Sequence, residues 1–167
     1  ARHVFHAPGE AWSTGCCIAV VAIDADTGVP RIEQLSCVDD IGTVVNPMLV
    51  EGQVLGGAAQ GIGEALMKRV VYDRDGQLLT GSLMDYAMPR ATDMPPVRLA
   101  SLHTPSPVNA LGAKGVGEAG TIGVPAAIAN AVMDALAPWG VDHLDMPLTA
   151  EKIWRAMRAA EAKGTTP

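Results

Sequence analysis

The sequence of 167 residues predicts an α+β fold, and three observations support this class. Two apolar, β-branched runs near the N-terminus are separated by a turn sequence, which is typical of a β-hairpin. Three later segments carry helix start or stop signals. Apolar residues make up 49% of the chain and charged residues 18%, so a core can form. We expect residues 1–163 to form one domain and residues 164–167 to be a flexible tail.

The expected strands are short and lie beside turn signals. Residues 15–26 form an apolar run that ends in Asp26-Thr27-Gly28, and residues 30–39 supply the second strand of the hairpin. A second hairpin is predicted over residues 70–79, because Asp75-Gly76 separates two short apolar runs. In the Pro-rich stretch that follows, only residues 97–103 have the pattern of a strand.

Three helices are predicted. The first covers residues 47–70, with Asn46 as N-cap and Pro47 in the first turn. The second covers residues 121–136, with Pro125 in its first turn, and the third covers residues 150–162. Thr149 is the expected cap of the third helix.

The first helix is unusually rich in glycine. Its five internal glycines cost about 3 to 5 kcal/mol relative to alanine unless close packing offsets them. Two explanations remain open at this point: tight packing against another element, or a ligand that lies against the helix backbone.

Composition excludes several classes of function. The net charge of −6 and the pI near 5.1 argue against binding to nucleic acid. No apolar run reaches the length of about 18 residues that spans a bilayer, so no transmembrane segment is expected. The three cysteines, Cys16, Cys17 and Cys37, lack a CxxC spacing and are expected to be reduced, buried thiols of a cytoplasmic protein. The histidines have no ligand spacing, and no metal site is predicted from them.

Residues 115–120 match the G-x-G-x-x-G pattern of dinucleotide-binding loops. No buried strand precedes the pattern, and no acidic residue stands at the required offset. An independent nucleotide-binding domain is therefore the least favoured interpretation. A Gly-rich loop that leads into a helix remains. Within it, Glu118 is either a partner of the helix dipole or a general base. Gln60, in the Gly-rich helix, is either a surface residue or an amide that contacts a heterocyclic cofactor.

Four sequence blocks in register resemble the molybdenum-binding subunit of the xanthine dehydrogenase family. They are residues 39–47 (DDIGTVVNP), residues 51–63 with EGQ and QGIG at their ends, residues 81–86 (GSLMDY) and residues 114–118 (KGVGE). The matches extend from about Val20 to Met157, and they look closest to the carbon monoxide dehydrogenase-like large subunits of bacteria. The resemblance implies that the chain is the C-terminal part of a longer subunit and forms the C-terminal part of its α+β molybdopterin-binding domain.

The resemblance also implies roles for individual residues. Glu118 corresponds to the catalytic base of the family, which activates the hydroxyl on molybdenum for attack on a substrate carbon while a hydride passes to the sulfido ligand. Gln60, Lys114, Gly115, Val116 and Gly117 are the expected cofactor-binding residues. The implied cofactor is molybdenum with molybdopterin cytosine dinucleotide, shared with the upstream part of the large subunit.

The implied partners are a [2Fe-2S] subunit and an FAD subunit, arranged as a dimer of heterotrimers. Carbon monoxide, an aldehyde and an N-heterocycle all remain possible substrates, with water as the oxygen source. No cysteine lies in the context of the copper ligand of true carbon monoxide dehydrogenases, so copper is not assigned. The chain alone is expected to be inactive, and a non-catalytic assembly module remains the alternative.

Overall fold

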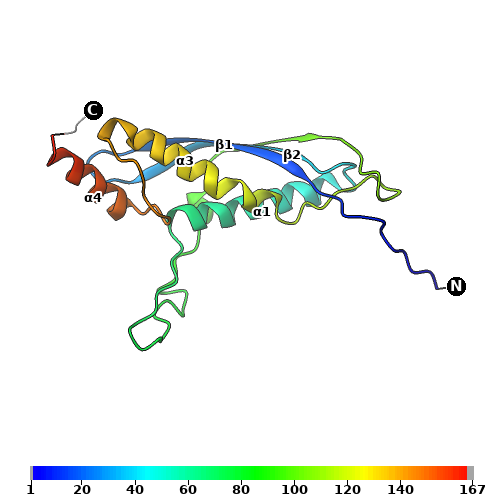
Figure 1. Ribbon diagram of the computed structural model, residues 1–167, viewed down its shortest axis with the longest axis horizontal. Helices are drawn as coiled ribbons and strands as arrows, with labels where there is room; N and C mark the ends of the chain where they lie inside the picture. Colours follow the sequence, from blue (N-terminus) through cyan, green and yellow to red (C-terminus); the bar gives the residue numbers. More distant parts are fainter. Residues whose placement is uncertain (1, 165–167) are drawn as a thin grey trace.

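A three-stranded sheet with helices packed on one face forms the body of the protein (Figure 1). The computed structural model describes residues 2–164. The regular elements are β1 (Thr14–Ile23), β2 (Pro30–Asp40), α1 (Pro47–Leu66), η1 (Ala91–Asp93), β3 (Val97–Leu102), α2 (Ala119–Ile122), α3 (Val124–Leu136), η2 (Ala137–Trp139) and α4 (Ala150–Glu161). This arrangement confirms the predicted α+β class.

The sheet has the order β1-β2-β3. β1 and β2 form the predicted antiparallel hairpin, and Gly28 adopts the positive φ of 72° that its turn requires. β3 pairs with β2 in parallel, with Leu35 opposite Val97. A parallel pair needs a crossover connection, and the chain segment that contains α1 supplies it.

Two helix boundaries differ from the prediction. α1 begins as expected, with Asn46 Oδ1 accepting the Leu49 amide at 3.2 Å, but it ends at Leu66 rather than at residue 70. The helical run predicted for residues 121–136 starts earlier, at Ala119, and is divided at Gly123 into α2 and α3. The division has a physical cause, because Pro125 has no amide hydrogen with which to continue the helical hydrogen bonding.

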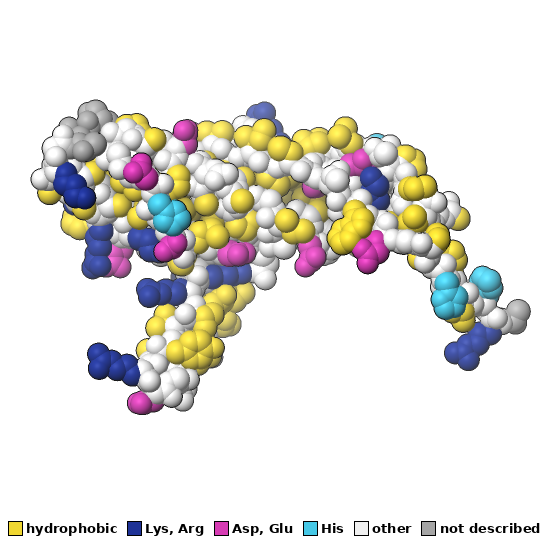
Figure 2. Space-filling view, in the orientation of Figure 1, with side chains coloured by type: hydrophobic (Ala, Val, Ile, Leu, Met, Phe, Trp, Pro, Cys, Tyr) yellow, Lys and Arg dark blue, Asp and Glu magenta, His cyan; other side chains and the backbone are white. Residues whose placement is uncertain are grey.

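The segment between α1 and η1 projects away from the body of the protein (Figure 1). The predicted hairpin is present there but short. Tyr72 and Leu78 form a bridge, and on either side of it the Leu79 amide donates to the Val71 carbonyl and the Asp73 amide to the Gln77 carbonyl. Apolar side chains lie along the projecting segment (Figure 2), and Met84 is 94% exposed. A lone hairpin without a sheet or helix to pack against is marginally stable, which accounts for the short pairing.

The core lies between the sheet and the helices. Leu35 and Cys37 of β2 meet buried side chains of α1 and α3, such as Ile62 and Ile128. Cys37 is buried as predicted, whereas Cys17 is half-buried and Cys16 is exposed. The prediction of burial is therefore wrong for Cys16, because side chains alternate between the two faces of a strand.

The helical run Ala119–Trp139 is long and apolar enough, by length and composition, to cross a membrane. We expected no such run from the sequence alone. Its apolar side chains Ile128, Val132 and Leu136 are fully buried in the core of this fold. One face of the run therefore packs in the core, and its composition alone does not identify a membrane span. Of the tail predicted for residues 164–167, residues 165–167 lie outside the described residues.

Candidate functional site

The predicted Gly-rich loop leads directly into α2, and Glu118 is the residue that precedes this short helix. The backbone carbonyl of Glu118 accepts the amides of Thr121 and Ile122 at 2.9 and 3.1 Å. Its side chain is exposed and has no hydrogen bond or ion pair to any of the residues from 2 to 164. The carboxylate is thus available to an external group, and Val116 packs beside the core at the base of the loop.

The start of the loop is held to the end of β2. The ammonium of Lys114 lies 3.3 Å from Asp40 Oδ2, and both side chains are largely buried. The Lys114 amide donates to the Ile41 carbonyl at 2.9 Å, and Gly42 forms an isolated bridge with Ala113. We call these contacts the Asp40–Lys114 clamp. They fix the loop four residues before Glu118.

Asp40 is the best-satisfied carboxylate of the site. Its Oδ1 accepts the amides of Thr104 and Gly42, each at 3.0 Å. The hydrogen bonds that Asp40 accepts hold its pKa well below the usual value, and those from Thr104 have the largest effect. The nearby Lys114 ammonium lowers the pKa further. Asp40 is therefore charged at neutral pH, and it serves the clamp rather than proton transfer.

A side chain of α1 holds the other end of the loop. Gln53 Nε2 donates to the Gly117 carbonyl at 3.0 Å. Gln53 is not among the residues predicted from the sequence, although it lies seven residues before Gln60 and so shares a helix face with it. The EGQ block that contains Gln53 was a signal in the sequence, but only the fold shows which loop it contacts.

Gln60 lies on the same side of the protein as the loop. It lines a small pocket of about 350 Å³ together with Thr121, which follows Glu118 by three residues. The Oε1 atom of Gln60 contacts the ammonium of Lys68, and Arg69 lies in the same pocket. The structure therefore gathers Gln60 and the segment just after Glu118 at one pocket, which is lined by two cationic side chains and by the acidic Glu64.

Close packing, one of the two explanations left open above, accounts for two of the glycines of α1. A Cβ on Gly57 would lie 2.9 Å from Gly120 Cα, and one on Gly61 would lie 2.9 Å from Val124 Cβ, so these two allow α2 and α3 to pack closely. In contrast, a Cβ on Gly52 or Gly56 would meet nothing within 4 Å. Packing accounts for the first pair, and the second pair leaves open helix backbone.

The loop does not have the setting of a dinucleotide fingerprint. In that fingerprint a buried strand leads directly into the glycines, but β3 ends at Leu102, well before Gly115. The helix that follows, α2, is only 4 residues long. Among residues 2–164, no three His, Cys, Asp or Glu side chains are close enough to hold a metal ion.

Comparisons with known proteins agree on one family. Residues 2–95 match the molybdopterin cofactor-binding domain. The chain is 42% identical over 147 residues to the nicotine 6-hydroxylase large subunit of Paenarthrobacter nicotinovorans, and this covers 88% of the chain and 18% of that protein.

Solved structures give the same result. Carbon monoxide dehydrogenase from Oligotropha carboxidovorans matches with a TM-score of 0.86 at 36% identity, over 90% of this chain and 19% of that one. Quinoline 2-oxidoreductase from Pseudomonas putida 86 matches with a TM-score of 0.80 at 47% identity, over 84% of this chain and 18% of that one. The chain thus spans about a fifth of the length of its relatives. It belongs to the molybdopterin cofactor-binding domain family, within the molybdenum hydroxylases that include carbon monoxide dehydrogenase, aldehyde oxidoreductase and xanthine dehydrogenase.

Proposed function

We propose that this chain is the C-terminal part of the large subunit of a molybdenum hydroxylase and supplies the general base of the reaction. The observation that carries the proposal is the exposed, unpaired carboxylate of Glu118 on a loop that is held at both ends. A carboxylate of this kind can accept a proton from a group that enters the site. The clamp and Gln53 limit where that carboxylate can lie.

The residues present fit part of a molybdopterin cradle. Gly115 and Gly117 are exposed and have no atoms around their missing Cβ positions, so a cofactor can approach their backbone. Gln60 can both donate and accept hydrogen bonds, which suits a pterin ring. Lys68 and Arg69 beside it suit a phosphate group.

Two of the predicted cofactor residues have roles within the loop itself. The Lys114 ammonium is already paired with Asp40, so in this proposal Lys114 supports the cofactor through the loop that it anchors. Val116 packs against the core and so supports the loop between Gly115 and Gly117. Direct contacts of Lys114 and Val116 with the cofactor stay predictions.

The reaction is the oxidation of a carbon–hydrogen bond or of carbon monoxide, with water as the source of oxygen. When bound, the molybdenum cofactor supplies the two-electron oxidation. Glu118 takes up a proton that water loses as its oxygen is transferred to the substrate carbon. Hydroxylation of a substrate RH by water then gives ROH, two protons and two electrons.

The electrons leave through partner subunits that carry [2Fe-2S] and FAD, in a cytoplasmic dimer of heterotrimers. This arrangement, like the cytosine dinucleotide form of the cofactor, rests on membership in the family. The substrate is a small carbon compound. We place an N-heterocycle first, because the relatives named for nicotine and quinoline share 42% and 47% identity with the chain, against 38% and 36% for two carbon monoxide dehydrogenases.

Glu118→Gln in the assembled enzyme tests the proposal. The amide cannot accept the proton, so we expect turnover to fall by about 10²- to 10⁴-fold. Molybdenum content should stay near that of the unmodified enzyme, and Glu33→Gln, an exposed change on β2, should leave turnover unchanged. Loss of molybdenum together with turnover would instead make Glu118 a structural residue.

A further inference from the structure

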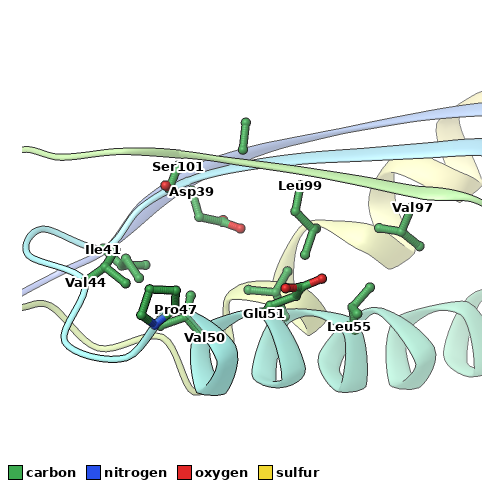
Figure 3. A pocket seen from close by; sticks show the side chains of 12 residues that line it. Asp39, Ile41, Val44, Pro47, Val50, Glu51, Leu55, Val97, Leu99 and Ser101 are labelled. Carbon is green, nitrogen blue, oxygen red and sulfur yellow. The ribbon is translucent and has the colours of Figure 1, made fainter.

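A cavity of about 340 Å³ lies between the sheet and the N-terminal half of α1 (Figure 3). Its walls are mainly apolar and include Val50, Val54 and Leu55 of α1 with Val97 and Leu99 of β3. It is separate from the Glu118 loop, because Glu51 lines the cavity whereas Gln53, two residues further along α1, reaches the loop. Residues two apart on a helix do not share a face.

Asp39 directs a carboxylate into this apolar space (Figure 3). It continues the core-facing side of β2 after Leu35 and Cys37, where the strand pattern calls for another apolar side chain. Gly15 lies directly opposite on β1, and a Cβ there would clash with the Asp39 carboxylate. The absence of a side chain at position 15 leaves room for the carboxylate.

The Asp39 carboxylate has no partner in the part of the chain that the structure describes. It is 8% exposed, and residues 2–164 offer it no hydrogen bond or ion pair. Burial raises its pKa above the usual value. Its oxygens keep some contact with solvent through the open side of the cavity, because no fully buried side-chain oxygen in residues 2–164 lacks a partner. A partly desolvated carboxylate of this kind is stabilised when an opposite charge pairs with it.

The surroundings of Asp39 define what can pair with it. Glu51 adds a second carboxylate from α1, Ser101 adds a hydroxyl from β3, and the residues that line the cavity include no Lys, Arg or His. The complementary group is a cation. Since the walls are apolar, the cation needs an aliphatic stem, as in the side chains of lysine and arginine.

The rim of the cavity favours a protein partner over a small molecule. Met48, which shares a helix face with Glu51 and Leu55, is 74% exposed. Val44, in the cavity wall, is partly exposed as well. Exposed apolar side chains around a cavity are typical of a surface that another polypeptide covers. The relatives are about five times longer than this chain, so the rest of such a subunit can supply the covering polypeptide.

We propose that this cavity receives a lysine or arginine side chain from the part of the large subunit outside this chain, paired with Asp39 and Glu51. The inference rests on the proposed function only in assuming that this larger subunit exists. The aliphatic stem lies between Val54 and Leu99, and the charged end lies between the two carboxylates. The contact locks α1 and the sheet to the rest of the subunit, away from the Glu118 loop.

A structure of the assembled large subunit tests this directly. We expect an ammonium or guanidinium nitrogen of the same subunit within about 4 Å of an Asp39 carboxylate oxygen. An apolar side chain, water alone, a second copy of the chain or a free cationic molecule in the cavity would overturn the proposal.

The variant Asp39→Leu gives a second test, because the proposal predicts whether the apparent melting temperature falls or rises. If a cation is present, leucine leaves that cation buried without a partner, and the apparent melting temperature of the assembled enzyme should fall by about 2 °C or more. If no cation is present, leucine fills the cavity and the temperature stays the same or rises, which contradicts the proposal. Glu33→Leu, an exposed acid on the same strand, is the matched control.

Molybdenum content and turnover are measured separately from these readouts. An enzyme that holds molybdenum but has no cation near Asp39 refutes this inference and leaves the proposed function intact. An enzyme without molybdenum in which a cation still occupies the cavity refutes the proposed function alone.

Discussion

The position of Glu118 depends on contacts that other residues make with its loop. Its carboxylate is free, but the loop below it is fixed by the Asp40–Lys114 clamp on one side and by Gln53 on the other. A base is effective only where it can reach the proton that it accepts, and a misplacement of about 1 Å can cost about 10²-fold in rate. We therefore assign Lys114 and Gln53 positioning roles.

Lys114→Met tests the clamp. Methionine keeps the length of the side chain but removes the charge, so we expect kcat to fall by about 10²-fold or less, with the pH profile of kcat displaced and molybdenum retained. Lys114→Arg should recover part of the activity, because it keeps the charge beside Asp40. Lys163→Met, an exposed change near the end of α4, is the control. An unchanged kcat and pH profile in Lys114→Met would remove Lys114 from the positioning role.

Asp40 gives the clamp a pH dependence. Its folded-state pKa lies below the unfolded value of about 3.9, so its carboxylate contributes stability above that pH and loses the contribution as the pH falls toward the folded-state pKa. Asp40→Asn should therefore lower the stability at pH 7, and the difference from the unmodified chain should shrink below about pH 4. Urea unfolding at a series of pH values measures this. A difference that stays constant between pH 7 and pH 3 would show that Asp40 acts through packing rather than charge.

At the scale of elements, four glycines of α1 form two pairs that differ in their surroundings. Gly57 and Gly61 let α2 and α3 approach the helix closely, and the Glu118 loop leads into this contact. Gly52 and Gly56 have open space around them. The closeness of α1 to α2 therefore sets the position of the loop.

Two alanine variants separate these groups. Gly57→Ala places a Cβ 2.9 Å from Gly120 Cα, so we expect a loss of roughly 1–3 kcal/mol in the free energy of unfolding. Gly56→Ala meets no atom within 4 Å, and its better helix propensity should stabilise the chain by up to about 1 kcal/mol. Urea unfolding of the purified chain measures both. Equal effects of the two substitutions would show that α1 and α2 are not closely packed at Gly57.

Elements with local signals could be predicted from the sequence, and contacts between distant segments could not. The β1–β2 hairpin follows from two apolar runs and one turn, and α4 follows from its cap at Thr149 and its apolar face. The parallel pairing of β3 with β2 and the pairing of Asp40 with Lys114 join segments far apart in the chain. No local pattern encodes such pairs. Glu118 could be proposed as a candidate from the sequence, because the residues of its Gly-rich loop are adjacent in the chain.

At the scale of the whole molecule, we propose that this chain provides one side of a larger site. It presents a free carboxylate, open glycine backbone and a pocket with two cations on one side, and an apolar cavity with an unpaired carboxylate on another. Each of these surfaces lacks a partner among the residues from 2 to 164. The chain spans about a fifth of its relatives, and we expect the remainder of the large subunit to complete both surfaces.

The molybdenum content of the complex purified through this chain tests the central claim most directly. We predict about one molybdenum atom per chain, together with the pterin cofactor, because the chain forms part of the cradle that retains them. Metal analysis of the complex isolated from its source, with a tag on this chain, makes the measurement. A molybdenum content near zero in an intact complex would contradict the account and would favour a non-catalytic assembly module.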